Sequence, residues 1–153
     1  VTLLPQRKNI QTIGGIKVRT RTIKKDFDFG VKKVWFGSSM VKIADPSRMI
    51  IDILDLPRFG GGGMHTIDVV EQYWNSDLCS PDLLLEYALK YNRGAIFKRL
   101  GFLAEKLNAP VSKNWIQLCH DHISKGLSNL DPDGAKTGGI VSKWNLRINL
   151  LLK

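Results

Sequence analysis

The spacing of apolar residues changes at the dipeptide Asp45-Pro46, and this change constrains the fold more than any other feature of the chain. Before it, residues 1–43 contain short alternating stretches separated by Gly turns, which are typical of β-strands. After it, residues 44–126 carry apolar side chains three and four positions apart, which is the period of an amphipathic helix. The two periods predict a basic β segment followed by a helical segment.

The N-terminal segment is expected to form antiparallel strands. Gly14-Gly15 separates residues 9–13 from residues 16–23, and a Gly pair supplies the positive φ angles of a tight hairpin turn. Residues 32–36 and 40–43 are further strand candidates on either side of a second Gly-containing turn. These signals predict a small sheet with one basic face.

Proline and capping residues predict where the helices begin. Asp45 and Ser80 each precede a proline, which combines an N-cap with Pro at the first helical position, and Ser112 is a third N-cap. The last segment, residues 140–152, alternates apolar and polar side chains and predicts a closing strand that returns to the N-terminal sheet. The expected helices cover residues 45–56, 66–74, 80–91, 95–107 and a stretch that begins at residue 112.

Together these elements predict one α+β domain over residues 1–153. Its small, mainly antiparallel sheet is built from N- and C-terminal strands and is covered by about five helices. No apolar run approaches the ~18 residues that spanning a bilayer requires, and no secretory signal precedes the first strand. Cys79 and Cys119 lie outside any CxxC motif, which suits a reducing compartment, and both thiols are expected on helices and partly buried. We therefore expect a cytoplasmic protein without a membrane partner.

The charge is distributed in three blocks. The chain has a net charge of +9. Residues 1–42 hold ten basic and two acidic side chains, and residues 90–153 hold eleven basic and four acidic ones. Between them, residues 43–89 hold two basic and eight acidic side chains. A positive excess of this kind favours polyanions such as DNA or RNA. It supports binding and gives no information about catalysis.

The basic residues are the candidate nucleic-acid contacts. Lys17, Arg19 and Arg21 alternate along one strand, so they point to one face. Lys98 and Arg99 are expected on the outer surface of a helix. An ordinary solvated face with edge lysines is the alternative, and no interleaved aromatic pair predicts base stacking. The complete set of candidates is Lys17, Arg19, Arg21, Lys24, Lys25, Lys32, Lys33, Lys98 and Arg99.

No pattern identifies a catalytic centre, a metal site or a cofactor. The run from Cys119 to His122 is metal-like in composition, but neighbouring helical residues diverge around the axis, so a structural role is expected. The turn Gly37-Ser38 lacks the paired Asp residues of a nucleotidyltransferase. We therefore expect a non-enzymatic protein; an unrecognised nuclease that depends on Asp52 is the alternative.

The glycine run Gly60–Gly63 allows two interpretations. Together with Arg58, its backbone amides could hold an anion at the start of the next helix. The other interpretation is a plain flexible connector.

Several segments resemble one protein family when they are taken in order. The segment Asp45-Pro-Ser-Arg-Met-Ile-Ile-Asp-Ile-Leu54 resembles the "DPxRTLLDLL"-like helix of the AbiEi family, and the Gly run resembles the Gly-Gly that follows it there. Leu84 to Leu89 and Asn92-Arg-Gly-Ala-Ile-Phe-Lys-Arg-Leu-Gly-Phe-Leu-Ala-Glu105 resemble its "L…YA…RLGYLLE" helix pair. Lys143-Trp-Asn-Leu-Arg-Ile-Asn149 resembles its closing "WxLxxN" strand. The resemblance runs from Val34 to the end of the chain.

AbiEi proteins are bacterial antitoxins and transcriptional regulators of abortive-infection (type IV) toxin–antitoxin systems. The resemblance implies that this chain is a C-terminal antitoxin domain that counteracts a nucleotidyltransferase toxin without a stable complex. It also implies repression of the protein's own promoter through an N-terminal winged helix, for which no recognition helix precedes Val34. The basic face is then expected to be an accessory phosphate contact on promoter DNA. A non-specific nucleic-acid-binding module is the alternative function.

Overall fold

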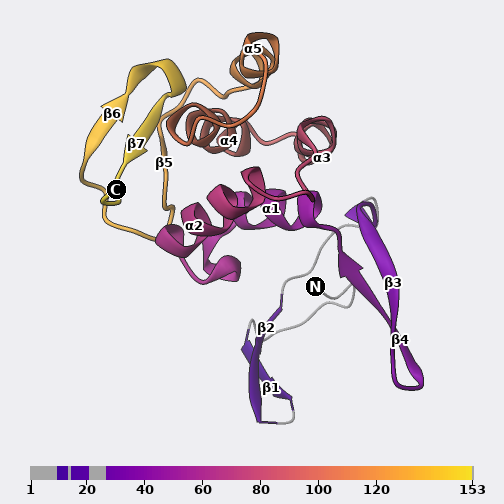
Figure 1. The fold of residues 1–153 in the computed structure, drawn as a ribbon. Helices are drawn as coiled ribbons and strands as arrows, with labels where there is room; N and C mark the ends of the chain where they lie inside the picture. Colours follow the sequence, from indigo (N-terminus) through magenta and orange to yellow (C-terminus); the bar gives the residue numbers. More distant parts are fainter. Residues whose placement is uncertain (1–9, 14, 21–26, 153) are drawn as a thin grey trace.

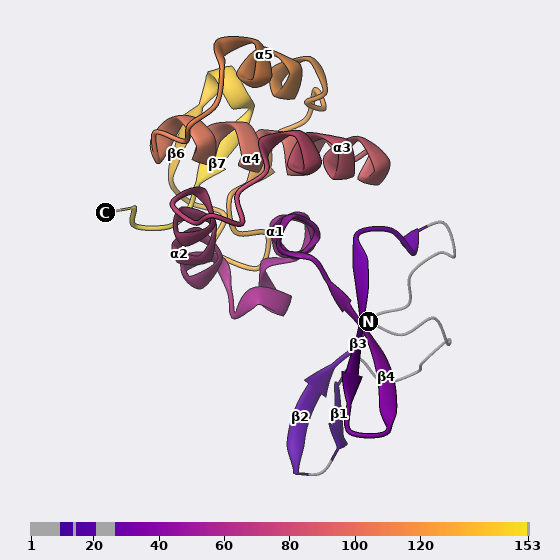
Figure 2. The same cartoon turned by 45° about the vertical axis from the view of Figure 1, so that its right-hand side comes forward.

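The predicted α+β class is confirmed by a computed structural model of the chain, which describes residues 10–13, 15–20 and 27–152 (Figure 1). Within this part of the chain, five α-helices pack into a body, and short strands form sheets around it. Figure 2 shows the two N-terminal hairpins below the helical body, with the C-terminal strands behind the helices. The change of period at Asp45 therefore marks the border between hairpins and body.

The five predicted helices are confirmed. Asp45 and Ser112 act as N-caps, since each side chain accepts a hydrogen bond from the backbone N–H three residues later, at 2.8 and 3.1 Å. Ser80 differs, because its side chain makes no capping hydrogen bond and its own N–H donates to the Tyr73 hydroxyl at 2.7 Å. The helices are α1 (Pro46–Asp55), α2 (Gly63–Trp74), α3 (Pro81–Tyr91), α4 (Gly94–Lys106) and α5 (Lys113–Asp121).

The strands pair differently from the expectation. Among the described residues, the N-terminal strands form two separate antiparallel hairpins and share no sheet with the C-terminal strands. The first hairpin joins β1 (Ile10–Ile13) to β2 (Ile16–Arg19), and the second joins β3 (Val31–Phe36) to β4 (Ser39–Ala44). A third sheet has β7 (Leu146–Ile148) at its centre, parallel to β5 (Ser128–Asn129) and antiparallel to β6 (Gly139–Val141).

The single closing strand predicted for residues 140–152 is wrong because the chain turns within it. A short 3-10 helix, η3 (Ser142–Trp144), follows β6, and Asn145 adopts the left-handed region at φ 46°. Asn tolerates this conformation better than most residues. The turn reverses the chain, so β7 pairs with β6 instead of with the N-terminal strands.

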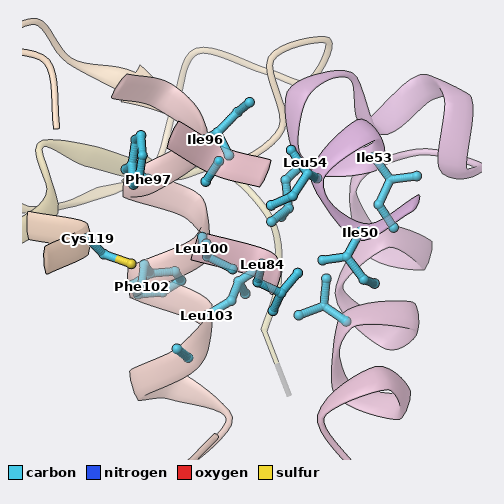
Figure 3. Close-up of a cluster of buried hydrophobic side chains, with 14 of the residues drawn as sticks. Ile50, Ile53, Leu54, Leu84, Ile96, Phe97, Leu100, Phe102, Leu103 and Cys119 are labelled. Atoms are coloured by element: carbon cyan, nitrogen blue, oxygen red, sulfur yellow. The ribbon is translucent and has the colours of Figure 1, made fainter. Parts of the chain in front are cut away.

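The hydrophobic core lies between α1, α3 and α4. Figure 3 shows Ile50 and Leu54 of α1 directed toward Leu84 of α3 and Leu100 of α4. All four side chains are buried, as is Cys119 of α5 on the far side of α4. The expectation of two helical cysteines holds for Cys119 alone, because Cys79 lies in the loop before α3. Both cysteines are free thiols, and burial raises the pKa of Cys119 to about 12.

The C-terminal turn docks on α4 through Trp144. The indole lies directly over Gly101, where an added Cβ would sit 2.1 Å from the Trp144 ring. Trp144 Nε1 donates to Glu105 Oε2 at 2.8 Å, and Lys143 Nζ donates to the other carboxylate oxygen. Position 101 therefore requires glycine because the indole packs so close to the helix backbone, and not because of an unusual backbone angle.

Replacing Gly101 with Ala should destabilise the protein by roughly 2 kcal/mol, although Gly→Ala in a helix interior ordinarily stabilises by about 1 kcal/mol. The reason is that the methyl group would displace the Trp144 ring from α4. Urea unfolding followed by circular dichroism measures the change. Gly139→Ala is the control, because a Cβ there meets open space, and an equal loss in both variants would contradict the packing role.

The Glu105 carboxylate should make stability depend on pH. Burial alone would raise its pKa, but the hydrogen bonds from Lys143 and Trp144 outweigh burial, so the pKa in the folded state lies below the ordinary 4.5. The stabilisation is therefore present above the unfolded-state pKa and is lost as the pH falls through the folded-state pKa.

We expect Glu105→Gln to be less stable than the wild type at neutral pH, and the difference to shrink between about pH 5 and pH 3. Urea unfolding at several pH values tests this. Glu71→Gln, at an exposed site of α2, should leave stability unchanged at each pH. A constant deficit of Glu105→Gln across the range would rule out the carboxylate as the cause.

Candidate nucleic-acid interface

Arg48 of α1 holds the segment that leads into hairpin β3–β4. This side chain is 3% exposed, and its Nη1 donates to the carbonyl oxygens of Phe27 and Phe29, at 3.1 and 2.8 Å. Its Nε donates to Asp52 at 3.2 Å. The guanidinium also lies over the rings of Phe29 and Tyr91, 4.3 and 5.0 Å from their centres. A single buried cation therefore fixes where the hairpin leaves the body.

Asp45 fixes the other end of the hairpin, where β4 passes into α1. Its backbone N–H donates to the carbonyl of Gly30 at 2.9 Å, which closes the base of the hairpin. Its carboxylate caps α1 and accepts a hydrogen bond from the hydroxyl of Tyr87 at 2.9 Å. Burial and this carboxylate raise the pKa of Tyr87 to about 12, so the tyrosine remains a donor. Both ends of the hairpin are thus attached to the helical body.

The register of β3–β4 places two lysines and two large apolar side chains on one face. Lys33 lies opposite Lys42 and Trp35 lies opposite Met40, and all four are exposed. Trp35 is 68% exposed. We call these four residues the Trp35 face. Sequence reasoning missed it, because the pairing of Trp35 with the lysines appears only once the strand register is known.

Lys32 and Lys33 do not act together, contrary to the expectation of one basic face. Adjacent strand residues point to opposite sides, so Lys32 lies on the other face, together with Val34 and Phe36. On the Trp35 face, Lys42 donates to Asp28 at 2.5 Å. Among the ion pairs of the described residues, none involves Lys33.

Hairpin β1–β2 carries further exposed cations. Lys17 and Arg19 are two residues apart on β2 and are both exposed, so they share one face as predicted. The remaining candidates of this region, Arg21, Lys24 and Lys25, lie outside the described residues. Because β1–β2 and β3–β4 are separate sheets, these cations do not form one continuous sheet face with Lys33.

The expectation that Lys98 and Arg99 lie on the outer surface of a helix is wrong. Lys98 is 0% exposed and Arg99 is 5% exposed, because α4 is the central helix and is covered on several sides. Lys98 Nζ donates to the carbonyl of Gly126 and, at 3.2 Å, to the hydroxyl of Ser128. Burial and the neighbouring Arg99 lower the pKa of Lys98. Neither cation is available to a nucleic-acid strand at the hairpins.

Arg99 is bound to two backbone carbonyls. Its Nη1 donates to Leu54 at 2.7 Å, and its Nε and Nη2 both donate to Asn129 at 3.0 Å. The side chain therefore joins α1, α4 and β5. In this position Arg99 has a structural role. Nothing in the sequence indicates that role, because the acceptors are main-chain atoms that lie far from Arg99 along the chain.

Asp52, the residue on which a nuclease alternative would depend, is occupied by structural contacts. It accepts hydrogen bonds from Arg48 and from the hydroxyl of Tyr91. The metal-like run is also spread apart: Cys119 is buried in the core, while the ring of His122 stacks on Phe97 with centroids 5.0 Å apart. No group of three or more His, Cys, Asp or Glu within the described ranges is placed to hold a metal ion.

The glycine connector is partly helical, and a carboxylate of the chain itself lies at the start of the helix that follows it. It begins with a 3-10 helix, η2 (Pro57–Gly60), and a Cβ added at Gly63 would lie 2.7 Å from Asp131 Oδ2. Asp131 therefore brings negative charge to the start of α2, where a helix favours it. Arg58 pairs with Asp133 at 3.8 Å. The chain supplies its own anions at this helix start.

In comparisons with known proteins, no protein-family model, curated protein or solved structure matches this chain. The helices among the described residues are too short or too polar to cross a bilayer.

Replacing Arg48 with Met should destabilise the protein by roughly 3 kcal/mol, because two carbonyls and a carboxylate lose a charged donor while the side-chain volume is kept. Urea unfolding measures the loss. Arg58→Met is the matched control, since that arginine is half exposed and paired only at 3.8 Å, and it should cost less than about 1 kcal/mol. Equal losses would refute the anchoring role of Arg48.

Proposed function

We propose that this chain is a non-enzymatic antitoxin and transcriptional-regulator domain that resembles AbiEi proteins, and that its N-terminal hairpins contact the phosphates of promoter DNA. The observation that carries the DNA contact is the Trp35 face, where Lys33 and Lys42 lie opposite each other beside an exposed Trp35 on a hairpin that projects from the body (Figure 1). Lys17 and Arg19 on the other hairpin add two exposed cations.

The ordered motifs support the antitoxin part of the proposal. The segments that resemble the family correspond to α1, α3, α4 and the turn into β7, which are the elements that build and close the core. Arg48, Arg99 and Trp144, which lie within these segments, each join separate parts of the body. The residues that resemble the family are therefore residues that hold the fold together, as expected of proteins that share a fold.

A nucleic-acid contact through the hairpins is expected to be largely independent of sequence. Lysine and arginine contacts to phosphates position a protein on DNA but carry no sequence information directly. The proposal therefore assigns operator recognition to a winged helix outside this chain. A free-standing non-specific binding module is the second candidate function, and the exposed cations on both hairpins favour it equally.

The phosphate contacts predict a reduced salt dependence in a triple variant. Lys17→Ala, Arg19→Ala and Lys33→Ala together should flatten the slope of log K against log salt by about 0.9 for each duplex phosphate that these side chains neutralise in the wild type. Fluorescence anisotropy with a labelled random-sequence duplex measures it. The matched control replaces Lys106, Lys113 and Lys125, three exposed lysines of the helical body, with Ala. An unchanged slope in the hairpin variant would exclude the proposed phosphate binding.

Trp35 supplies a second readout for the same face. The other three tryptophans of the chain, Trp74, Trp115 and Trp144, are at most 5% exposed, so a change of fluorescence on binding single-stranded oligonucleotide reports on Trp35. Quenching that Trp35→Phe abolishes would support stacking of a base on this residue.

The antitoxin function is tested by coexpression with a nucleotidyltransferase toxin of the kind that AbiEi proteins counteract. Restored growth without co-purification of the two proteins would support the proposal. The hairpin triple variant should still restore growth, because it alters only the DNA contact. Duplex binding without any growth rescue would instead favour the free-standing module.

A further inference from the structure

An open depression with a volume of about 400 Å³ lies on the surface beside the three-stranded C-terminal sheet. Its lining contains three cations, Arg99, Lys136 and Arg147, and no carboxylate; the other lining residues are Leu127, Ser128, Asn129 and Pro132. We call it the basic cavity. In both views the C-terminal sheet and the hairpins lie on different sides of the helical body (Figures 1 and 2), so the basic cavity is separate from the Trp35 face.

The cations of the basic cavity come from three elements that the fold brings together. Arg147 of β7 is paired with Asn129 of β5, and the Arg147 Nη1 donates to Asn129 Oδ1 at 3.4 Å. Lys136 stands on the loop between β5 and β6. Asn149 holds that loop, since its Nδ2 donates to the carbonyl of Ala135 at 2.8 Å. This hydrogen bond holds the backbone next to Lys136 in place.

Arg99 lines the basic cavity, and two of its N–H groups make no hydrogen bond among the described residues. A guanidinium has five N–H groups, and the bonds to Leu54 and Asn129 use one each on Nε, Nη1 and Nη2. Ser128 adds a hydroxyl proton, because its oxygen already accepts a hydrogen bond from Lys98. Guanidinium groups are well suited to oxyanions, which they bind with parallel N–H donors.

Three carboxylates, Asp55, Asp131 and Asp133, lie near the basic cavity but do not line it. Asp55 and Asp133 are paired with Arg93 and Arg58. Asp131 lies against the start of α2. Burial lowers the pKa of Arg99, and it outweighs the opposing effect of these three carboxylates, which are near enough to act on the guanidinium charge.

We propose that the basic cavity binds the phosphate group of a small phosphorylated ligand of about mononucleotide size. Its volume of about 400 Å³ has room for a ligand of this size, and its open shape leaves one side of the ligand in solvent. Arg99, Arg147 and Lys136 hold the phosphate oxygens, with Ser128 as a further donor. The exposed Leu127 and Pro132 provide apolar surface for the rest of the ligand.

Calorimetric titration of the whole chain with AMP, ribose 5-phosphate and adenosine tests the proposal. Saturable one-to-one binding is expected for the two phosphates and none for adenosine. Lys136→Glu and Arg147→Gln should each weaken AMP binding at least tenfold. Lys125→Glu, the same change at an exposed lysine outside the cavity, should leave binding unchanged. Thermal melts of each variant show whether it remains folded.

Three results would overturn the proposal. The first is an absence of saturable AMP binding, and the second is equal weakening by Lys125→Glu and Lys136→Glu. The third is a single-stranded oligonucleotide whose binding depends on Lys136 while AMP does not bind, because the phosphates would then belong to a nucleic acid. The hairpin triple variant should bind AMP normally, so this inference and the proposed DNA contact can fail separately.

Discussion

The buried guanidinium of Arg48 is the interaction on which the placement of the hairpins depends. It joins the first helix of the body to the two carbonyls that precede hairpin β3–β4 and to the aromatic rings beside them. A lysine could not replace it, because a single ammonium cannot donate to both carbonyls and the carboxylate while lying flat against Phe29 and Tyr91. The exposed face with Trp35 is thus held by a residue that is itself inaccessible.

The helical part of the fold could be predicted from the sequence because its signals are local. Asp45 and Ser112 cap their helices with their own side chains, and the apolar period of α1 matches its buried face. The strand pairing could not be predicted in the same way. It depends on Asn145, where a left-handed residue reverses the chain, and alternation alone does not distinguish one strand from two short ones.

The candidate site was predictable only in part, and Lys98 and Arg99 show why. Because both residues are charged, they were expected to be exposed to solvent. Instead, both side chains donate hydrogen bonds that hold α4 in place, and the acceptors of those bonds lie far away in the sequence. Lys17 and Arg19 were placed correctly because their alternation is a property of one strand. Trp35 was overlooked because its neighbours across the hairpin are set by register.

The burial of two adjacent cations on the central helix has a consequence for how the chain folds during synthesis. Both acceptors of Lys98 and one of the two acceptors of Arg99 lie between Gly126 and Asn129, and the indole that covers α4 comes from Trp144. A nascent chain that has emerged only as far as α4 would bury Lys98 without its partners and Arg99 without one of its two, which is costly. The body is therefore expected to complete its folding late, after the segment from Gly126 to Trp144 has left the ribosome.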